Sequence, residues 1–475
     1  MLKFRSFAVT MSVLLVASPP PLAASDGHAA ATSQAMLDAL HEVSGVPGFG
    51  AAVWQDGGTV WIGSTGMRDR ERSLPVEIDT RFRLASVSKL FAATALAKLA
   101  EEGRIDLDAP IAESLPWLDN AWPPITPRQL AAHTSGLPHY QAADSERGGI
   151  HYANGREAVE IFAKRPLLAP PGEDYSYSSW GYTLLGAIAE ELTGKSFPAL
   201  VEKAIAPGLD IGADATDSGD PTASVAYEFV DAVPARAAPH DFSYTWGGGG
   251  LMASAAGLAR FGGAMLENRI VSRETFDSMV EPTVLNSGEV ATDADYTVGF
   301  GWRAANSIEN EPIVFHNGVT IGARSSLVLW REEGTAATIL SNARWTSSIE
   351  STSQMLAAPF RRKPDGLVEA DCPVSVRRFS GTLGGNSVAG LVHFQKKDGI
   401  CQGTLELTGG FRDYFGQGPQ PVNGRIQIIG IDNEGGLSRA GFVTPYGIYD
   451  LRAAQGGRFR ATLSRTRQLD IAFGD

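Results

Sequence analysis

Long basic runs, metal-binding motifs and late hydrophobic stretches are scarce or missing in this sequence of 475 residues. The net charge is −13, and the longest basic run is only Arg361-Arg362-Lys363. A nucleic-acid-binding protein normally carries a basic patch, so we expect no nucleic-acid partner. The sequence has no HExxH or CxxC motif, and we expect neither a metal nor a cofactor. Beyond the N-terminus, no stretch is long and apolar enough to span a bilayer.

Cysteine is also rare, since the chain contains only Cys372 and Cys401. Their spacing is not that of a metal site. In an exported protein such a pair predicts a disulfide. The alternative is two separate buried thiols.

The N-terminus predicts export. Lys3 and Arg5 precede a short apolar run, 7–17, which ends near the small residues 23–25. This order is that of a secretory signal peptide, which we place at residues 1–24, so we expect a periplasmic or secreted protein. A membrane anchor is the weaker alternative because the apolar run is too short to span a bilayer comfortably.

Strand and helix patterns divide the rest of the chain into two parts. Residues 30–362 begin and end with strand patterns and carry a long helical insert between them. The predicted strands are 49–55, 59–62, 298–304, 312–315, 325–330 and 335–340, and the predicted helices include 29–44, 86–102, 181–192, 254–267 and 348–360. We therefore expect one sheet made from both ends of this domain.

A charged, turn-rich linker at 361–366 separates a C-terminal part, 366–475. There, short strand patterns alternate with glycine-containing turns, at 390–394, 403–408, 425–431, 447–452 and 458–463. Such spacing is typical of an antiparallel β barrel or sandwich.

Ser86 and Lys89 stand in the spacing S-x-x-K, directly before an apolar run, 90–99. A helix that is apolar nearly all round is a buried one. Residues three apart lie on the same helix face, so the amine would lie beside the hydroxyl and activate it as a nucleophile. The alternative is a solvent-facing helix start with Ser86 as its N-cap.

Two further motifs strengthen the first. Tyr177 lies in Tyr-Ser-Tyr-Ser-Ser-Trp-Gly, just before a predicted helix, and His316 and Gly318 lie in His-Asn-Gly at the end of a strand. With S-x-x-K, these motifs make the chain resemble the serine β-lactamase and penicillin-binding protein superfamily, in its class C β-lactamase and D,D-peptidase-like branch. Supporting stretches are 125–137, 248–251 and 258–261. The resemblance covers roughly residues 35–360. It implies an α+β fold in which an antiparallel sheet is flanked by helices.

The resemblance also implies roles for individual residues. Ser86 would attack a carbonyl and carry the acyl group, while Lys89 and Tyr177 would take its proton and return it to the leaving group. The backbone N–H groups of Ser86 and Val319 would form the oxyanion hole. A neighbouring ammonium lowers the pKa of a tyrosine, which agrees with this scheme.

Three positions would contact the substrate. Gly318 would let it lie close along the strand, and His316 would supply a donor or a positive charge. Ser179 stands where the family usually has Asn, and His316 stands where class C β-lactamases have Lys. Both departures favour a peptidase, amidase or esterase of small substrates over an efficient β-lactamase.

Alternative readings are a class C β-lactamase and a catalytically weak member used as a binding or scaffold protein. His133 is expected to be structural. Arg324 is a candidate for binding a substrate carboxylate, although an ion pair of its own is the preferred interpretation.

Overall fold

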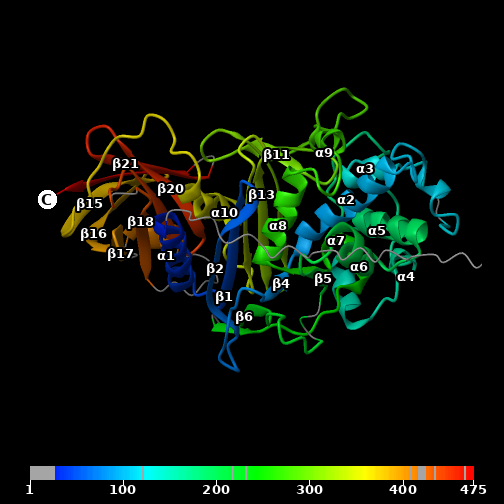
Figure 1. The fold of residues 1–475 in the computed structure, drawn as a ribbon, viewed down its shortest axis with the longest axis horizontal. Coiled ribbons are helices and arrows are strands. Elements are labelled where there is room, and N and C mark those ends of the chain that lie inside the picture. The colour runs from blue at the N-terminus through cyan, green and yellow to red at the C-terminus, as the bar shows by residue number, and fades with distance from the viewer. Residues whose placement is uncertain are drawn as a thin grey trace, which may run out of the picture.

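The strands predicted at both ends of the first domain form one antiparallel sheet (Figure 1). The computed structural model describes residues 27–474 except 120–121, 215, 217, 231–232, 407–408, 416–423, 433–434 and 465–466. The predicted signal peptide lies outside the described residues. The strand order is β3-β2-β1-β14-β13-β12-β11-β10-β9, so the first and last segments of the domain pair at the centre of the sheet.

The strands of this sheet are β1 (Gly48–Gln55), β2 (Gly58–Asp69), β3 (Leu74–Pro75), β9 (Thr292–Asp293), β10 (Tyr296–Val298), β11 (Arg303–Asn306), β12 (Pro312–Thr320), β13 (Ala323–Trp330) and β14 (Thr335–Ser341). A single strand predicted at 298–304 is wrong, because the chain bends between β10 and β11. Gly301 has a φ of +88°, and the N–H of Gly299 donates to the carbonyl of Trp302. Glycine permits this bend because it has no Cβ.

Helices cover both faces of the sheet. α8 (Ala255–Leu266) packs on β1 and β14, where a Cβ at Gly263 would lie only 2.3 Å from the Trp54 ring. α1 (Gly27–Ser44) and α10 (Ile349–Ala357) pack on the other face. The three-layer arrangement buries both sides of the central strands, whose residues are almost all apolar or small.

The helical insert packs around α2 (Ser88–Glu101), which is buried along most of its length, as its apolar sequence predicts. A 3₁₀ turn, η1 (Ala85–Val87), precedes it, so the α-helix begins two residues after the predicted start. None of the described helices is long and apolar enough to cross a membrane. The insert contains η2 (Ile111–Glu113), α3 (Pro127–Ala131), η3 (Ala142–Gly149), α4 (Gly155–Val159), α5 (Ser179–Thr193), α6 (Phe197–Leu200), the π-helical η4 (Val201–Ile205), η5 (Ser243–Thr245) and α7 (Trp246–Gly249).

Smaller elements complete the first domain. They are β4 (Arg81–Arg83), β5 (Ile211–Ala213), β8 (Leu251–Ser254), the hairpin β6 (Tyr227–Val230) and β7 (Val233–Arg236), α9 (Arg273–Val280) and η6 (Ala358–Phe360). β8 lies between β4 and β5 in a short antiparallel sheet.

The C-terminal part is a closed eight-stranded antiparallel barrel, which decides between the predicted barrel and sandwich (Figure 1). Closure pairs the first strand with the last and leaves no free edge. One helix, which the sequence did not predict, packs against β16. The elements are β15 (Val376–Leu383), β16 (Asn386–Lys397), β17 (Ile400–Glu406), α11 (Gly409–Phe415), β18 (Arg425–Gly430), β19 (Arg439–Thr444), β20 (Gly447–Ala454), β21 (Arg458–Ser464) and β22 (Arg467–Gly474).

The barrel shares a hydrophobic core with the sheet domain. Met36 of α1 and Met355 of α10 belong to the same buried cluster as Ile429 and Ile448 of the barrel. In Figure 1, α1 lies between the barrel and the sheet. Arg439 on β19 adds a buried ion pair to Glu309 of the sheet domain, at 2.5 Å. Independent folding of residues 366–475 stays a prediction. A separated barrel would expose the apolar side chains that it buries in this shared core.

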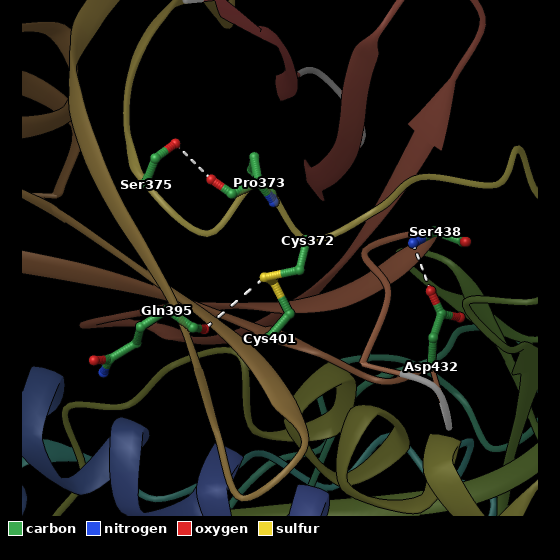
Figure 2. Close-up of a disulfide and its surroundings, with 7 residues drawn as sticks. All are labelled: Cys372, Pro373, Ser375, Gln395, Cys401, Asp432 and Ser438. Atoms are coloured by element: carbon green, nitrogen blue, oxygen red, sulfur yellow. Dashed lines mark hydrogen bonds between the residues drawn. A yellow bond between two sulfur atoms is a disulfide. The ribbon is translucent and has the colours of Figure 1, made fainter.

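A disulfide joins Cys372 to Cys401, with a Cα–Cα distance of 5.7 Å. Figure 2 shows that it ties the segment before β15 to β17. Close by, Asp432 accepts a hydrogen bond of 2.6 Å from the N–H of Ser438. The bridge therefore holds the connecting segment against the barrel wall.

We expect reduction of the disulfide to destabilise the barrel without affecting Ser86. The bridge closes a loop of 29 residues, for which loop entropy predicts about 3–4 kcal/mol. Thermal unfolding with and without reductant measures the effect, and Cys372→Ser, at the less buried end of the bridge, is the matched variant. Equal unfolding temperatures in all three samples would contradict the prediction, while labelling of Ser86 by a fluorophosphonate serves as the control.

Candidate active site

Ser86 lies where β4 turns into the buried helix α2. Ala85, directly before it, has a φ of +47°, a left-handed conformation that is unfavourable for a residue with a Cβ. Tertiary contacts hold this turn, since the Ser325 hydroxyl donates to the Leu84 carbonyl at 2.6 Å. Such strain persists only where the surroundings enforce it. The turn presents Ser86, partly exposed, at the edge of a cavity of about 400 Å³.

Lys89 is fully buried one turn beyond Ser86. Its Nζ donates to the Ser86 Oγ at 3.1 Å, to the Ser179 Oγ at 2.9 Å and to the Gly248 carbonyl at 2.6 Å. No described carboxylate forms an ion pair with it. Burial lowers the pKa of Lys89, and the nearby Tyr177 opposes that shift. The structure thus contains an amine whose neutral form is favoured compared with an exposed lysine.

Tyr177 completes the group. Its hydroxyl donates to the Ser86 Oγ at 2.8 Å, and its ring centroid lies 5.0 Å from the Lys89 Nζ. Burial alone would raise the pKa of Tyr177, but the positive charges of Lys89 and Arg303 outweigh it and leave the pKa below the ordinary value. Because Lys89 and Tyr177 each shift the pKa of the other, the proton that Ser86 gives up is assigned to the two residues together.

His133 contacts Tyr177 and the two residues that flank it. The His133 carbonyl accepts from the N–H of Ser176 at 2.8 Å, and its Nδ1 accepts from the N–H of Ser178 at 3.1 Å. Its ring lies 4.3 Å from the Tyr177 ring. Burial and the charge of Lys89 keep the pKa of His133 well below its usual value, so the imidazole is neutral and able to accept. These contacts agree with the structural role expected of His133, which here is to position Tyr177.

Ser179 opens α5, with Ser178 as the N-cap whose hydroxyl accepts from the N–H of Gly181. The N–H of Ser179 donates to His139 Nδ1 at 3.3 Å. Burial and Lys89 lower the pKa of His139 to about 4. Two neutral imidazoles therefore satisfy the first N–H groups of this helix, which would otherwise lack partners.

His316 and Gly318 lie on β12, and the surroundings of His316 correct one expectation. His316 is buried, its Nδ1 donates to the Asn317 carbonyl at 2.7 Å, and burial followed by the charges of Arg303 and Lys89 holds its pKa well below its usual value. A neutral imidazole supplies no positive charge. A Cβ at Gly318 would lie 2.3 Å from the Leu84 carbonyl oxygen, so the packing of the Ser86 turn by itself requires glycine here. The substrate contact expected of Gly318 stays a prediction.

Val319 lies on the same strand and lines the cavity together with Ser86. β11 pairs with β12 only as far as Phe315, so beyond that point one edge of β12 is left to face η1. Thr320 pairs with Ala323 across a two-residue turn. N–H groups alternate in direction along an antiparallel strand. Because the N–H of Thr320 faces β13 at this turn, the N–H of Val319 faces away from β13, toward the edge of β12 that lies against η1 and Ser86.

Arg303 is the residue that the sequence reasoning missed. Its guanidinium lies 4.5 Å from the Tyr296 ring centroid and 5.7 Å from that of Tyr177. It pairs across the β11–β12 hairpin with Phe315, next to His316. Pairing the predicted strands 298–304 and 312–315 as a hairpin would have placed Arg303 beside His316 and so identified it from the sequence. Arg324, in contrast, donates to the carbonyls of Arg344 and Ser347, at 2.7 and 3.4 Å, and has no ion pair with a described residue, so the preferred interpretation of it is wrong.

Replacing His133 tests its hold on Tyr177. His133 has a φ of +59°, which glycine and asparagine tolerate well. His133→Gly removes the acceptor and the ring without strain, and we expect the rate of Ser86 labelling to fall on the order of tenfold or more, as for a displaced catalytic group. His133→Asn keeps an acceptor near the Ser178 N–H and should retain more of the rate. If both variants label Ser86 at the wild-type rate, with unfolding temperatures similar to that of the wild type, this role is contradicted.

Replacing Arg303 tests the electrostatics of the site. The charge of Arg303 lowers the pKa of both Lys89 and Tyr177, so its removal raises both. Whichever group accepts the proton, its basic form then appears only at higher pH. Arg303→Gln should therefore move the rising limb of the pH profile for Ser86 labelling to higher pH. Arg128→Gln, whose arginine is paired with Asp108 at 2.7 Å and does not line the cavity, should leave it in place. An unchanged midpoint in Arg303→Gln would refute the assignment.

Known proteins resemble this chain in sequence and in fold. The chain is 25% identical over 412 residues to the serine beta-lactamase-like protein LACTB, mitochondrial, of Homo sapiens. This match covers 67% of this chain and 75% of that protein. The chain is also 28% identical over 344 residues to a D-aminopeptidase of Cereibacter sphaeroides. This match covers 70% of this chain and 63% of that protein. The octameric penicillin-binding protein homologue from Pyrococcus abyssi matches in fold, with a TM-score of 0.59 at 21% identity, over 92% of this chain and 99% of that one.

The family expected from the three motifs is confirmed by a match over most of the first domain. The family model described as Beta-lactamase matches residues 34–351, a span that runs from α1 to the start of α10 and contains the three motifs. The chain therefore belongs to the beta-lactamase family, whose fold is that of the serine β-lactamases and penicillin-binding proteins.

Proposed function

We propose that this protein is an exported serine hydrolase that cleaves amide or ester bonds of small substrates through an acyl-enzyme on Ser86. One observation carries the proposal. The Ser86 Oγ accepts hydrogen bonds from both Tyr177, at 2.8 Å, and Lys89, at 3.1 Å. A serine hydroxyl is a weak nucleophile until a neighbouring base removes its proton, and this pair supplies the base.

The proton path follows from the contacts. With Tyr177 as phenolate and Lys89 as ammonium, or with the neutral pair, one acceptor lies within hydrogen-bond distance of the Ser86 Oγ. As Ser86 attacks the carbonyl, its proton passes to the pair, and Tyr177 returns a proton to the leaving group. Water then attacks the acyl group by the same path in reverse. The third contact of Lys89, to the Gly248 carbonyl, keeps its Nζ in place during the transfers.

The negative charge that forms on the carbonyl oxygen needs donors. The backbone N–H groups of Ser86 and Val319 are the candidates, because both residues line the cavity and β12 faces the Ser86 turn there. Donors fixed by the backbone stabilise an oxyanion without reorganising. The strained turn at Ala85 sets the direction of the Ser86 N–H.

Similarity to a D-aminopeptidase supports amide hydrolysis. Export is proposed from residues 1–24 alone, whose charge and apolar pattern is that of a signal peptide.

A class C β-lactamase is the second candidate, because the family includes such enzymes and the S-x-x-K and tyrosine positions are occupied. The third motif argues against it. A β-lactam drug is an anion, and the strand position where class C enzymes carry a lysine holds the neutral, buried His316. A scaffold protein without catalysis would not need a buried Lys89 that forms no ion pair with a described carboxylate.

Single substitutions test the catalytic assignment. We expect Ser86→Ala to abolish acyl-enzyme formation, and Lys89→Ala and Tyr177→Phe each to slow it by about a hundredfold or more, the usual contribution of general acid–base catalysis. Lys98→Ala, a partly buried lysine on the same helix, is the matched control and should retain the full rate. Intact-protein mass spectrometry measures the acyl adduct.

The substrates for that experiment should include esters, D-amino-acid amides and β-lactams. Faster turnover of esters or amides than of cephalosporins supports the proposal. A β-lactam kcat/KM that equals the best ester or amide would favour the second candidate, and full turnover by Ser86→Ala would refute both.

A further inference from the structure

The cavity beside Ser86 extends away from the proton-transfer pair. Two segments of the helical insert, 139–145 and 240–249, and the end of β12 enclose its volume of about 400 Å³. This volume lies within the range of about 300–1,000 Å³ found for small-molecule sites. The mechanism above uses only its edge, where Ser86, Ser179 and Val319 lie.

The geometry decides which half of a substrate enters the cavity. The carbonyl carbon bonds to the Ser86 Oγ, and its oxygen faces the N–H groups of Ser86 and Val319. The leaving group must lie against Tyr177, which returns its proton. Tyr177 does not line the cavity, so the remaining substituent, the acyl group, is the part that points into it.

Aromatic rings form the inner wall, and their polar atoms are already bonded. The Tyr140 hydroxyl donates to the Thr245 Oγ1 at 2.6 Å, and the Tyr244 hydroxyl is 3.1 Å from His240 Nε2. The Tyr140 and Tyr244 rings meet edge to face, with centroids 5.9 Å apart. With their hydroxyls engaged, these side chains offer the cavity their apolar ring atoms.

Phe242 is the purely apolar part of this wall. Its side chain is buried, and the guanidinium of Arg83 lies 4.9 Å from its ring centroid. Arg83 is itself held by Asp214 at 2.8 Å. The ring is thus fixed from behind, and a fixed aromatic wall favours a flat apolar group that packs edge to face or offset against it.

The formal charges that line the cavity are paired. The Asp144 carboxylate accepts from Arg165 at 2.6 and 2.8 Å and from the N–H of Gln141 at 2.7 Å. Arg344, at the rim, is paired with Glu228 at 2.7 Å. A charged acyl group would lose its hydration here without gaining a free counter-ion.

We propose that this cavity selects substrates with an uncharged aromatic acyl group, such as phenylacetyl, bonded through its carbonyl to the leaving group. The inference rests on the proposed function and names the substrate class of the same site. It predicts a preference that depends on the acyl half alone, whatever leaving group Tyr177 protonates.

The test uses p-nitrophenyl esters, which share one leaving group and differ only in the acyl half. The full chain is assayed with the acetate, hexanoate, phenylacetate and hemisuccinate, each rate being divided by that of its hydroxide-catalysed hydrolysis. We expect the kcat/KM for phenylacetate to exceed that for acetate by about tenfold or more, in line with burial of a whole apolar ring. Hexanoate should fall between them, and the anionic hemisuccinate should be the poorest.

Variants locate the preference. Phe242→Leu should reduce the ratio of phenylacetate to acetate several-fold, whereas Phe229→Ala, whose ring packs 4.1 Å from Trp345 outside the cavity, should leave the ratio unchanged. The wild-type ranking alone decides the matter if Phe242→Leu does not fold. Equal kcat/KM for acetate and phenylacetate, or efficient turnover of the hemisuccinate, would overturn the inference while an acyl adduct on Ser86 still upheld the proposed function. Turnover without an adduct on Ser86, and undiminished in Ser86→Ala, would overturn both.

Discussion

The site depends on one constraint, the burial of an amine inside an apolar helical core. Lys89 is surrounded by residues of α2, α5 and α7, and its three hydrogen bonds go to a hydroxyl on the nucleophile, a second hydroxyl and a backbone carbonyl. None of these acceptors carries a full charge. A buried ammonium in such surroundings is costly, and the cost falls when the proton is shared with a neighbouring group. Tyr177 is that neighbour, so the packing of the core and the activation of Ser86 have the same origin.

The histidines of the site act through their neutral forms. His133, His139 and His316 all have lowered pKa values because they are buried or close to Lys89. Two of them accept N–H groups at the start of α5, which a protonated imidazole with both nitrogens occupied would not do. The positive charges near the Tyr177 ring are therefore those of Lys89 and Arg303, at 5.0 and 5.7 Å from its centroid.

The barrel is joined to the catalytic part by packing as well as by sequence. α1 contributes to a core that includes sheet residues on one side and barrel residues on the other. Arg361 and Arg439 converge on Glu309 between the two parts, and each is buried with its charge paired. Removing one partner of such a group leaves an unpaired buried charge, which is more damaging than loss of the whole group. The position of the barrel is therefore specific, although it lies far along the chain from Ser86.

The sequence by itself determined the family, the two-part architecture and the group formed by Ser86, Lys89 and Tyr177. Local patterns encode these features: an apolar helix after S-x-x-K, a capping serine after the tyrosine, and alternating strands separated by glycine turns. Only the tertiary structure placed Arg303 and His133 around Tyr177, closed the barrel, neutralised His316 and assigned Gly318 to the packing of the Ser86 turn. Each of these depends on contacts between segments far apart in the chain. Hydrophobic periodicity says which face of a segment is buried, but not which distant segment covers it, and it is the covering segment that sets the charge, strain and hydrogen bonding of a site.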